Sequence, residues 1–340
     1  MASPIWPIPS ETSPPTRPGL VVILATGGTI AGTAARSDQH HAYQSAQLGI
    51  ADLVAAVPEL AAVPLDTEQV AQVDSKDMSP EIWVTLARRV AHHLARPDVA
   101  GVVITHGTDT LEETAIFLEM ALAHRCEHRP VVLTAAMRPA TSSQADGPQN
   151  LADAVAVARW SMSRGILAVM AGIVWRGLDV RKVHGHRLDA FSGGDAAPWA
   201  RIDAGVPVRL QTTSAPELPH PPMDLADLPA RNEDWPWVEI VTSHAGASGR
   251  GVKAWVAAGV RGLVVAATGN GTVHHALLQA LEAAQRSGVV VWRATRCVAG
   301  GWVADEAESL PTERTWPASG CALTPAQARV ALQWQLLTRP

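Results

Sequence analysis

The sequence predicts an α/β protein with two domains, a larger N-terminal domain built on a parallel sheet and a smaller C-terminal α/β domain. Apolar, β-branched runs alternate with helical patterns, and this order implies parallel strands covered by helices on both faces. The alternation is lost in a stretch rich in proline and aspartate and then resumes, which is typical of a linker. We therefore expect a flexible arm at residues 1–18, the N-terminal domain at 19–205, a linker at 206–236 and the C-terminal domain at 237–340.

The expected strands of the N-terminal domain are short apolar runs, and the segment after Ser79 shows how the intervening helices are assigned. Ser79 is suited to cap a helix and Pro80 to its first turn. From Ile82 to Leu94, apolar residues recur every four positions along one face. The strands are expected at Leu20–Ala25, Gln69–Val73, Gly101–Ile104, Val131–Thr134 and Ile166–Met170.

The C-terminal domain repeats the pattern on a smaller scale. Strands are expected at Val238–Val241, Leu263–Ala267 and Val289–Trp292. A closing helix begins after Thr324, because Thr-Pro-Ala-Gln has the form of a capping box and apolar residues follow at helical spacing.

Composition favours a small-molecule ligand. The chain has 340 residues, 47% of them hydrophobic, and a net charge of −5. Its basic residues are scattered, which argues against nucleic acid or an anionic membrane as the main partner. No apolar run is long enough to span a bilayer. Residues 1–18 lack the charged start and apolar stretch of a secretory signal, so a cytoplasmic protein is expected.

The cysteines, the histidines and the sequence motifs predict neither a metal site nor a cofactor. Three cysteines, Cys126, Cys297 and Cys321, are far apart and odd in number, which suits reduced thiols. Adjacent histidines point in different directions on helices or strands, and no acidic or cysteine partners recur at ligand spacing. The dinucleotide-binding fingerprint and the P-loop are both absent from the sequence.

Two threonine-bearing turns carry the functional signal. Thr26-Gly27-Gly28-Thr29-Ile30-Ala31-Gly32 follows the first expected strand, and Thr105-His106-Gly107-Thr108-Asp109-Thr110 follows the third. Each turn places glycines, a hydroxyl and the start of a helical pattern at the carboxyl end of a parallel strand, where open α/β sheets bind their ligands. Glycine allows close approach of the backbone to a substrate.

These turns resemble the two signatures of the bacterial-type L-asparaginases, the asparaginase/glutaminase family. The resemblance extends from Leu20 to the C-terminus. It implies an amidohydrolase that converts L-asparagine to L-aspartate and ammonia through an acyl-enzyme, without a cofactor, in a homotetramer built from intimate dimers. It continues through Ala136-Met137-Arg138-Pro139-Ala140-Thr141-Ser142, Ala145-Asp146-Gly147-Pro148, Asp179-Val180-Arg181-Lys182 and Gly269-Asn270-Gly271.

The resemblance also implies catalytic roles. Thr29 is similar to the family's nucleophile, and Tyr43, the only tyrosine of the chain, to the base on a mobile loop. A threonine hydroxyl needs such a base, because it is unreactive at its free pKa. Thr108, Asp109 and Lys182 resemble the second triad, in which lysine is required because arginine stays charged.

Substrate contacts follow from the same resemblance. Asp109 would bind the α-ammonium of the amino acid and Ser75 its α-carboxylate. Ala136 would offer its backbone carbonyl to the leaving amide, and Asn270 would come from the neighbouring subunit. An acidic residue is also expected from the loop at 305–308, where the alignment is loose and either Glu306 or Glu308 fits.

Lys76 departs from the family pattern, which has Gln or Glu at this position. In the pocket its ammonium would repel the α-ammonium of the substrate by several kcal/mol at about 4 Å. Lys76 therefore turns outward, pairs with an acid such as Asp77, or marks a changed specificity.

Three alternatives to an L-asparaginase stay open. They are a glutaminase-asparaginase of mixed specificity, an amidotransferase subunit that releases ammonia for tRNA-dependent amidation, and a catalytically poor amino-acid-binding or sensing relative.

Overall fold

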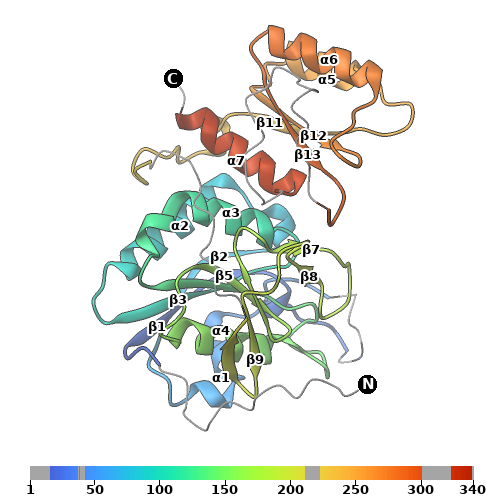
Figure 1. Cartoon of the computed structure of the whole chain (residues 1–340). Helices are drawn as coiled ribbons and strands as arrows, with labels where there is room; N and C mark the ends of the chain where they lie inside the picture. Colours follow the sequence, from blue (N-terminus) through green and yellow to red (C-terminus); the bar gives the residue numbers. More distant parts are fainter. Residues whose placement is uncertain (1–15, 37, 39–42, 211–222, 301–322, 339–340) are drawn as a thin grey trace.

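A mixed sheet of eight strands forms the centre of the N-terminal domain in the computed structural model (Figure 1). The structure describes residues 16–36, 38, 43–210, 223–300 and 323–338. The strand order is β10-β9-β6-β5-β4-β3-β1-β2. The strands are β1 (Leu20–Gly27), β2 (Leu65–Val73), β3 (Val99–Thr105), β4 (Pro130–Thr134), β5 (Gly165–Met170), β6 (Ile173–Arg176), β9 (Ala200–Asp203) and β10 (Val206–Arg209).

Five neighbouring strands of this sheet, β2, β1, β3, β4 and β5, are parallel, as the sequence predicts. The other three strands add an antiparallel edge that the sequence analysis missed. Two-residue turns, Ala171-Gly172 and Ala204-Gly205, join β5 to β6 and β9 to β10. Both residues of each turn have positive φ, and so short a connection can only reverse the chain. β10 therefore continues the sheet into residues 206–209, which the sequence analysis expected to begin the linker. The limits of the two domains stay a prediction.

Helices cover both faces of this sheet (Figure 1). α2 (Pro80–Leu94) and α3 (Leu111–Leu122) lie on the face nearer the C-terminal domain, and α1 (Ile50–Ala55) and α4 (Gly147–Arg159) lie on the other. α2 begins as its sequence predicts, because the Ser79 hydroxyl accepts a hydrogen bond from the backbone N–H of Ile82. Short 3-10 turns are η1 (Thr29–Ala31), η2 (Pro58–Leu60), η3 (Ser75–Asp77), η4 (Ala123–Arg125) and η5 (Asn232–Asp234).

The C-terminal domain has a parallel sheet in the order β11-β12-β13. Its helix α7 (Pro325–Thr338) starts with the predicted capping box, in which Thr324 and Gln327 exchange side-chain to backbone hydrogen bonds. The other elements are β11 (Val238–Thr242), α5 (Arg250–Ala257), β12 (Gly262–Ala267), α6 (His275–Arg286) and β13 (Val290–Thr295), and a small hairpin of β7 (Arg181–Lys182) and β8 (Phe191–Ser192) belongs to the N-terminal domain.

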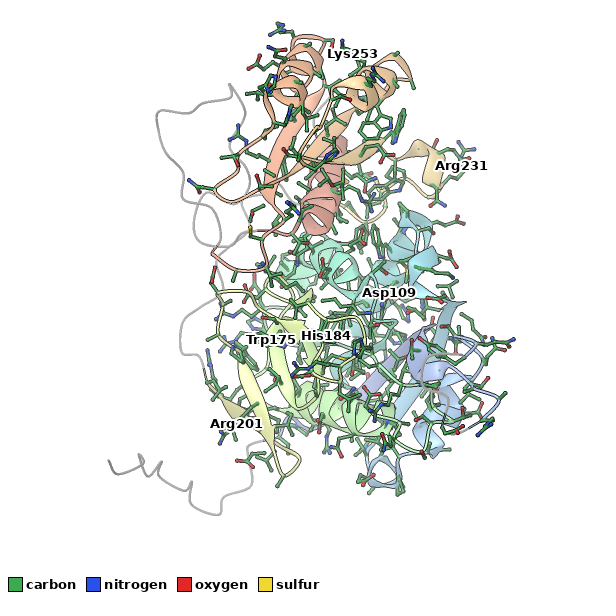
Figure 2. All side chains as sticks on the ribbon, turned by 90° about the vertical axis from the view of Figure 1, so that its right-hand side faces the viewer. Asp109, Trp175, His184, Arg201, Arg231 and Lys253 are labelled. Carbon is green, nitrogen blue, oxygen red and sulfur yellow. The ribbon has the colours of Figure 1, made fainter. Side chains whose placement is uncertain are left out.

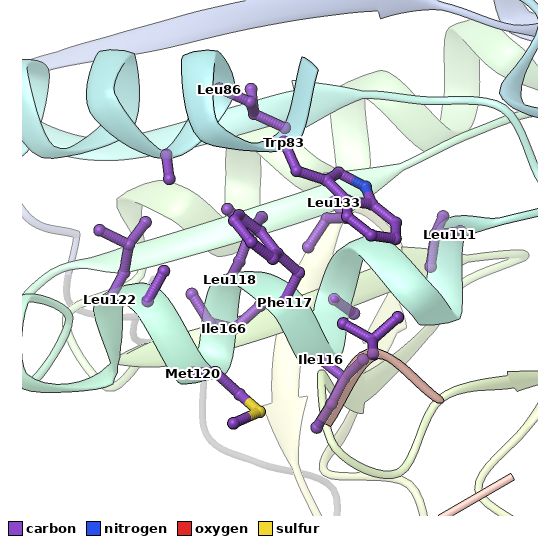
Figure 3. Close-up of a cluster of buried hydrophobic side chains, with 14 of the residues drawn as sticks. Trp83, Leu86, Leu111, Ile116, Phe117, Leu118, Met120, Leu122, Leu133 and Ile166 are labelled. Carbon is purple, nitrogen blue, oxygen red and sulfur yellow. The ribbon is translucent and has the colours of Figure 1, made fainter. Parts of the chain in front are cut away.

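α7 joins the two domains, because it packs between its own sheet and α3 (Figure 1). The apolar core of α2 and α3, drawn in Figure 3, therefore continues into the C-terminal domain. Phe117 of α3 stacks on Trp83 at 5.3 Å between ring centroids and meets Trp334 of α7 edge-on at 5.9 Å. Such aromatic pairs add to the free energy of apolar burial. Lys253, on α5, lies at the outer end of this domain (Figure 2).

None of the helices in the described ranges combines the length and the apolar character that crossing a bilayer requires.

The turns that follow β1 and β3 touch through bare backbone. Gly28 has φ 82°, and a Cβ on it would overlap the backbone of Gly107. A Cβ on Gly107 would overlap the Ser75 side chain and approach Gly28 Cα to 3.2 Å. Glycine is therefore required on both sides of this contact, which fixes the spacing of the two threonine turns.

We expect Gly28→Ala to lower the midpoint of thermal unfolding much more than Gly205→Ala. The φ angles are 82° and 79°, so alanine meets backbone strain of about 1–3 kcal/mol at both positions, and the strain at Gly28 is the larger because its ψ of −173° lies in a region that essentially only glycine adopts. A Cβ on Gly205 has no atom within 4 Å, whereas one on Gly28 overlaps Gly107. Scanning fluorimetry of both variants measures the difference, and equal shifts would contradict a tight contact between the turns.

Candidate active site

The predicted site residues of the N-terminal domain lie where parallel strands end. Thr29 begins η1 directly after β1, and Thr108 and Asp109 follow β3. Ala136 follows β4, and Ser75 begins η3 after β2. Because the carboxyl ends of parallel strands share one edge of a sheet, the fold gathers these five residues on that edge.

The hydroxyls of Thr29 and Tyr43 form a hydrogen bond of 2.7 Å between Oγ1 and Oη. Tyr43 is held there by an antiparallel bridge between Thr33 and Gln44, whose two backbone hydrogen bonds are 2.9 Å each. Gly32 leaves room for the phenol ring, because a Cβ on it would lie 3.0 Å from Tyr43 Cδ2. The structure thus brings together the predicted nucleophile and the predicted base.

Lys182 binds the second threonine turn. Its ammonium donates to Thr108 Oγ1 at 2.8 Å and to Asp109 Oδ1 at 2.6 Å. The side chain of Lys182 is 19% exposed and that of Asp109 is 56% exposed. Lysine, threonine and aspartate therefore form one connected group, which is open to solvent on the aspartate side.

Ser75 is attached to the same turn. Its hydroxyl accepts a hydrogen bond from the backbone N–H of Asp109 at 3.2 Å, and its carbonyl accepts one from the Thr110 hydroxyl at 2.7 Å. Ser75 is buried. These contacts fix its hydroxyl next to the backbone of Asp109.

Lys76 faces away from this group. Its ammonium lies 2.6 Å from Asp77 and 3.4 Å from Asp74, and the side chain is 61% exposed. The hydrogen bond to Asp77 is the main reason that the pKa of Lys76 is raised from its ordinary value. In the structure, the Lys76 side chain turns outward and pairs with acidic residues, which is one of the possibilities that the sequence left open.

Asp146 and Asn150 hold the backbone around Ala136. The Asp146 carboxylate accepts hydrogen bonds from the N–H groups of Met137 and Arg138 at 2.9 and 3.0 Å. Asn150 donates to the carbonyl of Ala135 at 2.9 Å. The sequence analysis assigned neither residue a role, although Asp146 lies in one of the motifs that carry the resemblance.

His106 was also missed, and it stiffens the turn that carries Thr108. Its Nδ1 lies 2.7 Å from the carbonyl of Gly107 and must donate to it, which leaves Nε2 as an acceptor. The Thr114 hydroxyl donates to Nε2 at 2.9 Å and accepts from the Trp83 indole at 2.8 Å. Burial lowers the pKa of His106 to about 4. The imidazole is therefore neutral at pH 7, and every group in this network has a partner.

The structure places Asn270 in the C-terminal domain. Asn270 lies after β12 in the C-terminal domain, in a turn closed by a bridge between Thr268 and Thr272. Glu306 and Glu308 lie outside the described residues.

Three or more histidine, cysteine or acidic side chains do not gather into a possible metal site anywhere in the described ranges. The expectation that the protein works without metal stays a prediction.

Family models match both domains. The model "Asparaginase, N-terminal" matches residues 20–215 and "Glutaminase/Asparaginase C-terminal domain" matches residues 237–339. The chain belongs to the asparaginase/glutaminase family. This membership confirms the resemblance predicted from the two threonine turns.

Individual relatives are similar over nearly the whole chain. L-asparaginase 2 of Escherichia coli is 38% identical over 93% of this chain and 88% of its own. A glutaminase-asparaginase of Pseudomonas fluorescens is 36% identical over 94% and 87%. The crystal structure of a probable cytoplasmic L-asparaginase from Campylobacter jejuni is 33% identical and superposes with a TM-score of 0.84, covering 94% and 96% of the two chains.

We expect His106 to make folding sensitive to mild acid. The unfolded chain protonates this residue near pH 6.5, whereas the folded chain resists protonation until about pH 4. Its contribution to the free energy of unfolding is therefore complete above pH 6.5 and falls, by about 3 kcal/mol in total, as the pH drops to 4. Denaturant titrations at several pH values should show a shallower loss for His106→Gln than for the wild type.

His92, an exposed histidine on α2, supplies the control. His92→Gln should retain the pH dependence of the wild type. If His106→Gln loses stability with falling pH as steeply as His92→Gln does, another group causes the acid sensitivity.

Proposed function

We propose that the chain hydrolyses the side-chain amide of L-asparagine to L-aspartate and ammonia. The observation that carries this proposal is the 2.7 Å hydrogen bond between Thr29 and Tyr43, on the same sheet edge as the group of Thr108, Asp109 and Lys182. A hydroxyl beside a proton acceptor is what acyl transfer through a covalent intermediate requires. The family membership and the names of the relatives support the same reaction.

In the first half-reaction, Thr29 Oγ1 attacks the amide carbon and its proton moves to Tyr43 Oη. As Tyr43 takes up this proton, it gives its own phenolic proton to the leaving nitrogen, so that the C–N bond breaks, ammonia departs and an ester on Thr29 remains. The carbonyl of Ala136 accepts from the amide NH₂ and orients it. Asp146 and Asn150 make this possible by fixing the flanking backbone.

In the second half-reaction, water attacks the ester on Thr29. Thr108 lies on the neighbouring turn, and its oxygen accepts a hydrogen bond from Lys182, so its hydroxyl proton is directed toward the pocket. We assign Thr108 and Lys182 to orienting this water and exchanging its proton. The water proton returns to Thr29 Oγ1 as the ester C–O bond breaks, and aspartate is released.

Substrate recognition rests on Asp109 and Ser75. The Asp109 carboxylate is 56% exposed although it binds Lys182, so it can also accept from the α-ammonium of an amino acid. Ser75 presents its hydroxyl beside it for the α-carboxylate. Lys76 is paired with Asp77 outside this group. An L-amino acid can therefore bind without repulsion between its α-ammonium and the ammonium of Lys76.

L-Glutamine is the second candidate substrate, because a relative of 36% identity is named glutaminase-asparaginase. Ammonia release from asparagine and from glutamine, measured under the same conditions with the purified chain, distinguishes the two. Binding of aspartate without ammonia release from either amide would support a sensing protein instead.

We also propose a cytoplasmic location. The relative of known structure from Campylobacter jejuni is described as a probable cytoplasmic L-asparaginase. Cys126 and Cys297 are free thiols, as suits a reducing compartment.

We expect Thr29→Ala to abolish turnover of asparagine while aspartate still binds, because only the attacking hydroxyl is lost. The control is Thr33→Ala, which removes a hydroxyl from the same segment while the backbone bridge to Gln44 stays intact. Ammonia release and calorimetric titration with aspartate measure the two effects. Turnover in Thr29→Ala that matches Thr33→Ala would rule out Thr29 as the nucleophile.

We further propose that the chain works as a homotetramer in which Asn270 completes the site of a neighbouring subunit. Asn270 lies in the turn after β12, in a different domain from Thr29, so a neighbouring chain is a natural recipient. A monomer would then lack part of the site.

Mixing Thr29→Ala chains with Asn270→Ala chains should restore part of the activity. A hybrid dimer assembles one pocket with an intact Thr29 from one chain and an intact Asn270 from the other. The mixture is assayed for ammonia release, and mass spectrometry verifies subunit exchange. Exchange without recovered activity would mean that Asn270 acts in its own chain or takes no part in the reaction.

A further inference from the structure

One carboxylate, that of Glu112, contacts both the segment that carries Lys182 and the start of α7. Glu112 lies in the first turn of α3. Its Oε2 accepts a hydrogen bond from the backbone N–H of Lys182 at 2.7 Å. Its Oε1 accepts one from the hydroxyl of Thr324 at 2.9 Å. Glu112 therefore bridges a residue of the candidate site and the cap of a helix in the C-terminal domain.

Neighbouring contacts show that this bridge is part of a larger attachment. Gln327, in the first turn of α7, donates to the carbonyl of Val180 at 3.0 Å. Arg181 donates to the carbonyl of Val298 at 3.1 Å, in the segment after β13. The two residues before Lys182 are thus hydrogen-bonded to the C-terminal domain of the same chain, and Glu112 makes the corresponding contact for Lys182 itself.

The chemistry of Glu112 fits a positioning role. The side chain is largely buried, and burial raises the pKa of its carboxyl group above the ordinary value. A buried carboxyl costs free energy unless donors satisfy it. Within the described part of the chain, each of the two oxygens has one donor, and these donors, Lys182 and Thr324, are 142 residues apart in sequence. Removing the carboxyl would leave a backbone N–H and a hydroxyl without this partner.

We propose that Glu112 is a positioning residue of the active site, which fixes the backbone of Lys182 relative to the start of α7 so that its ammonium reaches Thr108 and Asp109. The inference rests on the catalytic role proposed for Lys182. The long side chain of lysine keeps its 2.8 Å contact with Thr108 Oγ1 only if its backbone is fixed. Misplacing a catalytic group by about 1 Å can reduce the rate about a hundredfold.

The adjacent residue supplies a matched control. Glu113 forms an ion pair of 3.0 Å with Arg329 and so joins the same two helices, α3 and α7. Glu113→Ala therefore removes a carboxylate and an interdomain contact without removing the hydrogen bond to Lys182. A merely structural role of Glu112 predicts that Glu112→Ala and Glu113→Ala behave alike.

We expect Glu112→Ala to lower kcat for asparagine about ten- to hundredfold, with KM within about threefold of the wild type. Glu113→Ala should keep kcat within about twofold. Glu112→Gln should recover most of the loss, because an amide oxygen can accept from the Lys182 N–H and the amide NH₂ can donate to the Thr324 hydroxyl. Kinetics of the three variants at one pH decide the point.

Thr324 tests the other end of the bridge, and it serves if Glu112→Ala does not fold. Thr324→Val should lower kcat, whereas Thr324→Ser, which keeps the hydroxyl, should not. Crystal structures of Glu112→Ala or Thr324→Val, and of Glu113→Ala, add a readout that does not depend on turnover. The contact of Lys182 with Thr108 should be lost in Glu112→Ala and in Thr324→Val, and it should be kept in Glu113→Ala.

The outcomes separate the two proposals. A wild type that does not hydrolyse asparagine rejects the proposed function, and the position of Lys182 in the variant structures then decides the role of Glu112. Suppose that the wild type is active, that Glu112→Ala and Thr324→Val have the same kcat as Glu113→Ala, and that Lys182 keeps its position in their structures. This result would overturn the inference about Glu112 and leave the proposed function standing.

Discussion

The backbone contact between Gly28 and Gly107 is the constraint on which the site depends. It joins the turns that follow two neighbouring parallel strands, β1 and β3, and it leaves no space for a Cβ on either side. Because the turns meet this closely, Thr29 and Thr108, which each follow one of these glycines, start from adjacent points of the same sheet edge. Hydrogen bonds hold the contact from both sides, because His106 satisfies the carbonyl of Gly107 and the backbone N–H of Gly28 donates to the carbonyl of Val73. Burial of that histidine in its neutral form makes the arrangement suited to neutral pH.

Sequence reasoning succeeded where local rules decide. The parallel strands, the cap of α2 and the capping box of α7 follow from periodicity and from side chains a few residues apart, and the structure contains all of them. Strand β2 begins four residues earlier than predicted, at Leu65, because this edge strand leaves much of its first half exposed and polar. The sequence left the position of Lys76 open, because a lysine close to Asp74 and Asp77 can pair with either acid and only the fold decides where it points.

What the sequence could not supply were contacts between distant segments. Glu112 reads as an ordinary first-turn acid of a helix, and only the tertiary structure brings it to Lys182 and Thr324. His106, Asp146 and Asn150 are similar cases, because each is defined by the backbone groups it satisfies after folding. The antiparallel edge of the sheet was missed for a different reason, since turns of Ala-Gly do not have the strongest hairpin sequences. Residues that support a site are therefore harder to find than the residues that react.

The backbone bridge between Thr33 and Gln44 has a consequence for how this part of the chain can change over evolution. Both ends of the intervening loop are held by that bridge, and Gln47 and Leu48 are hydrogen-bonded to Ala31 just beyond it. Residues can therefore be inserted or deleted inside the loop while Tyr43 keeps its place beside the bridge. Even doubling such a loop costs only about 0.6 kcal/mol of closure entropy. Related chains are free to vary the loop in length and composition, while the hydrogen bond between Thr29 and Tyr43 stays the same.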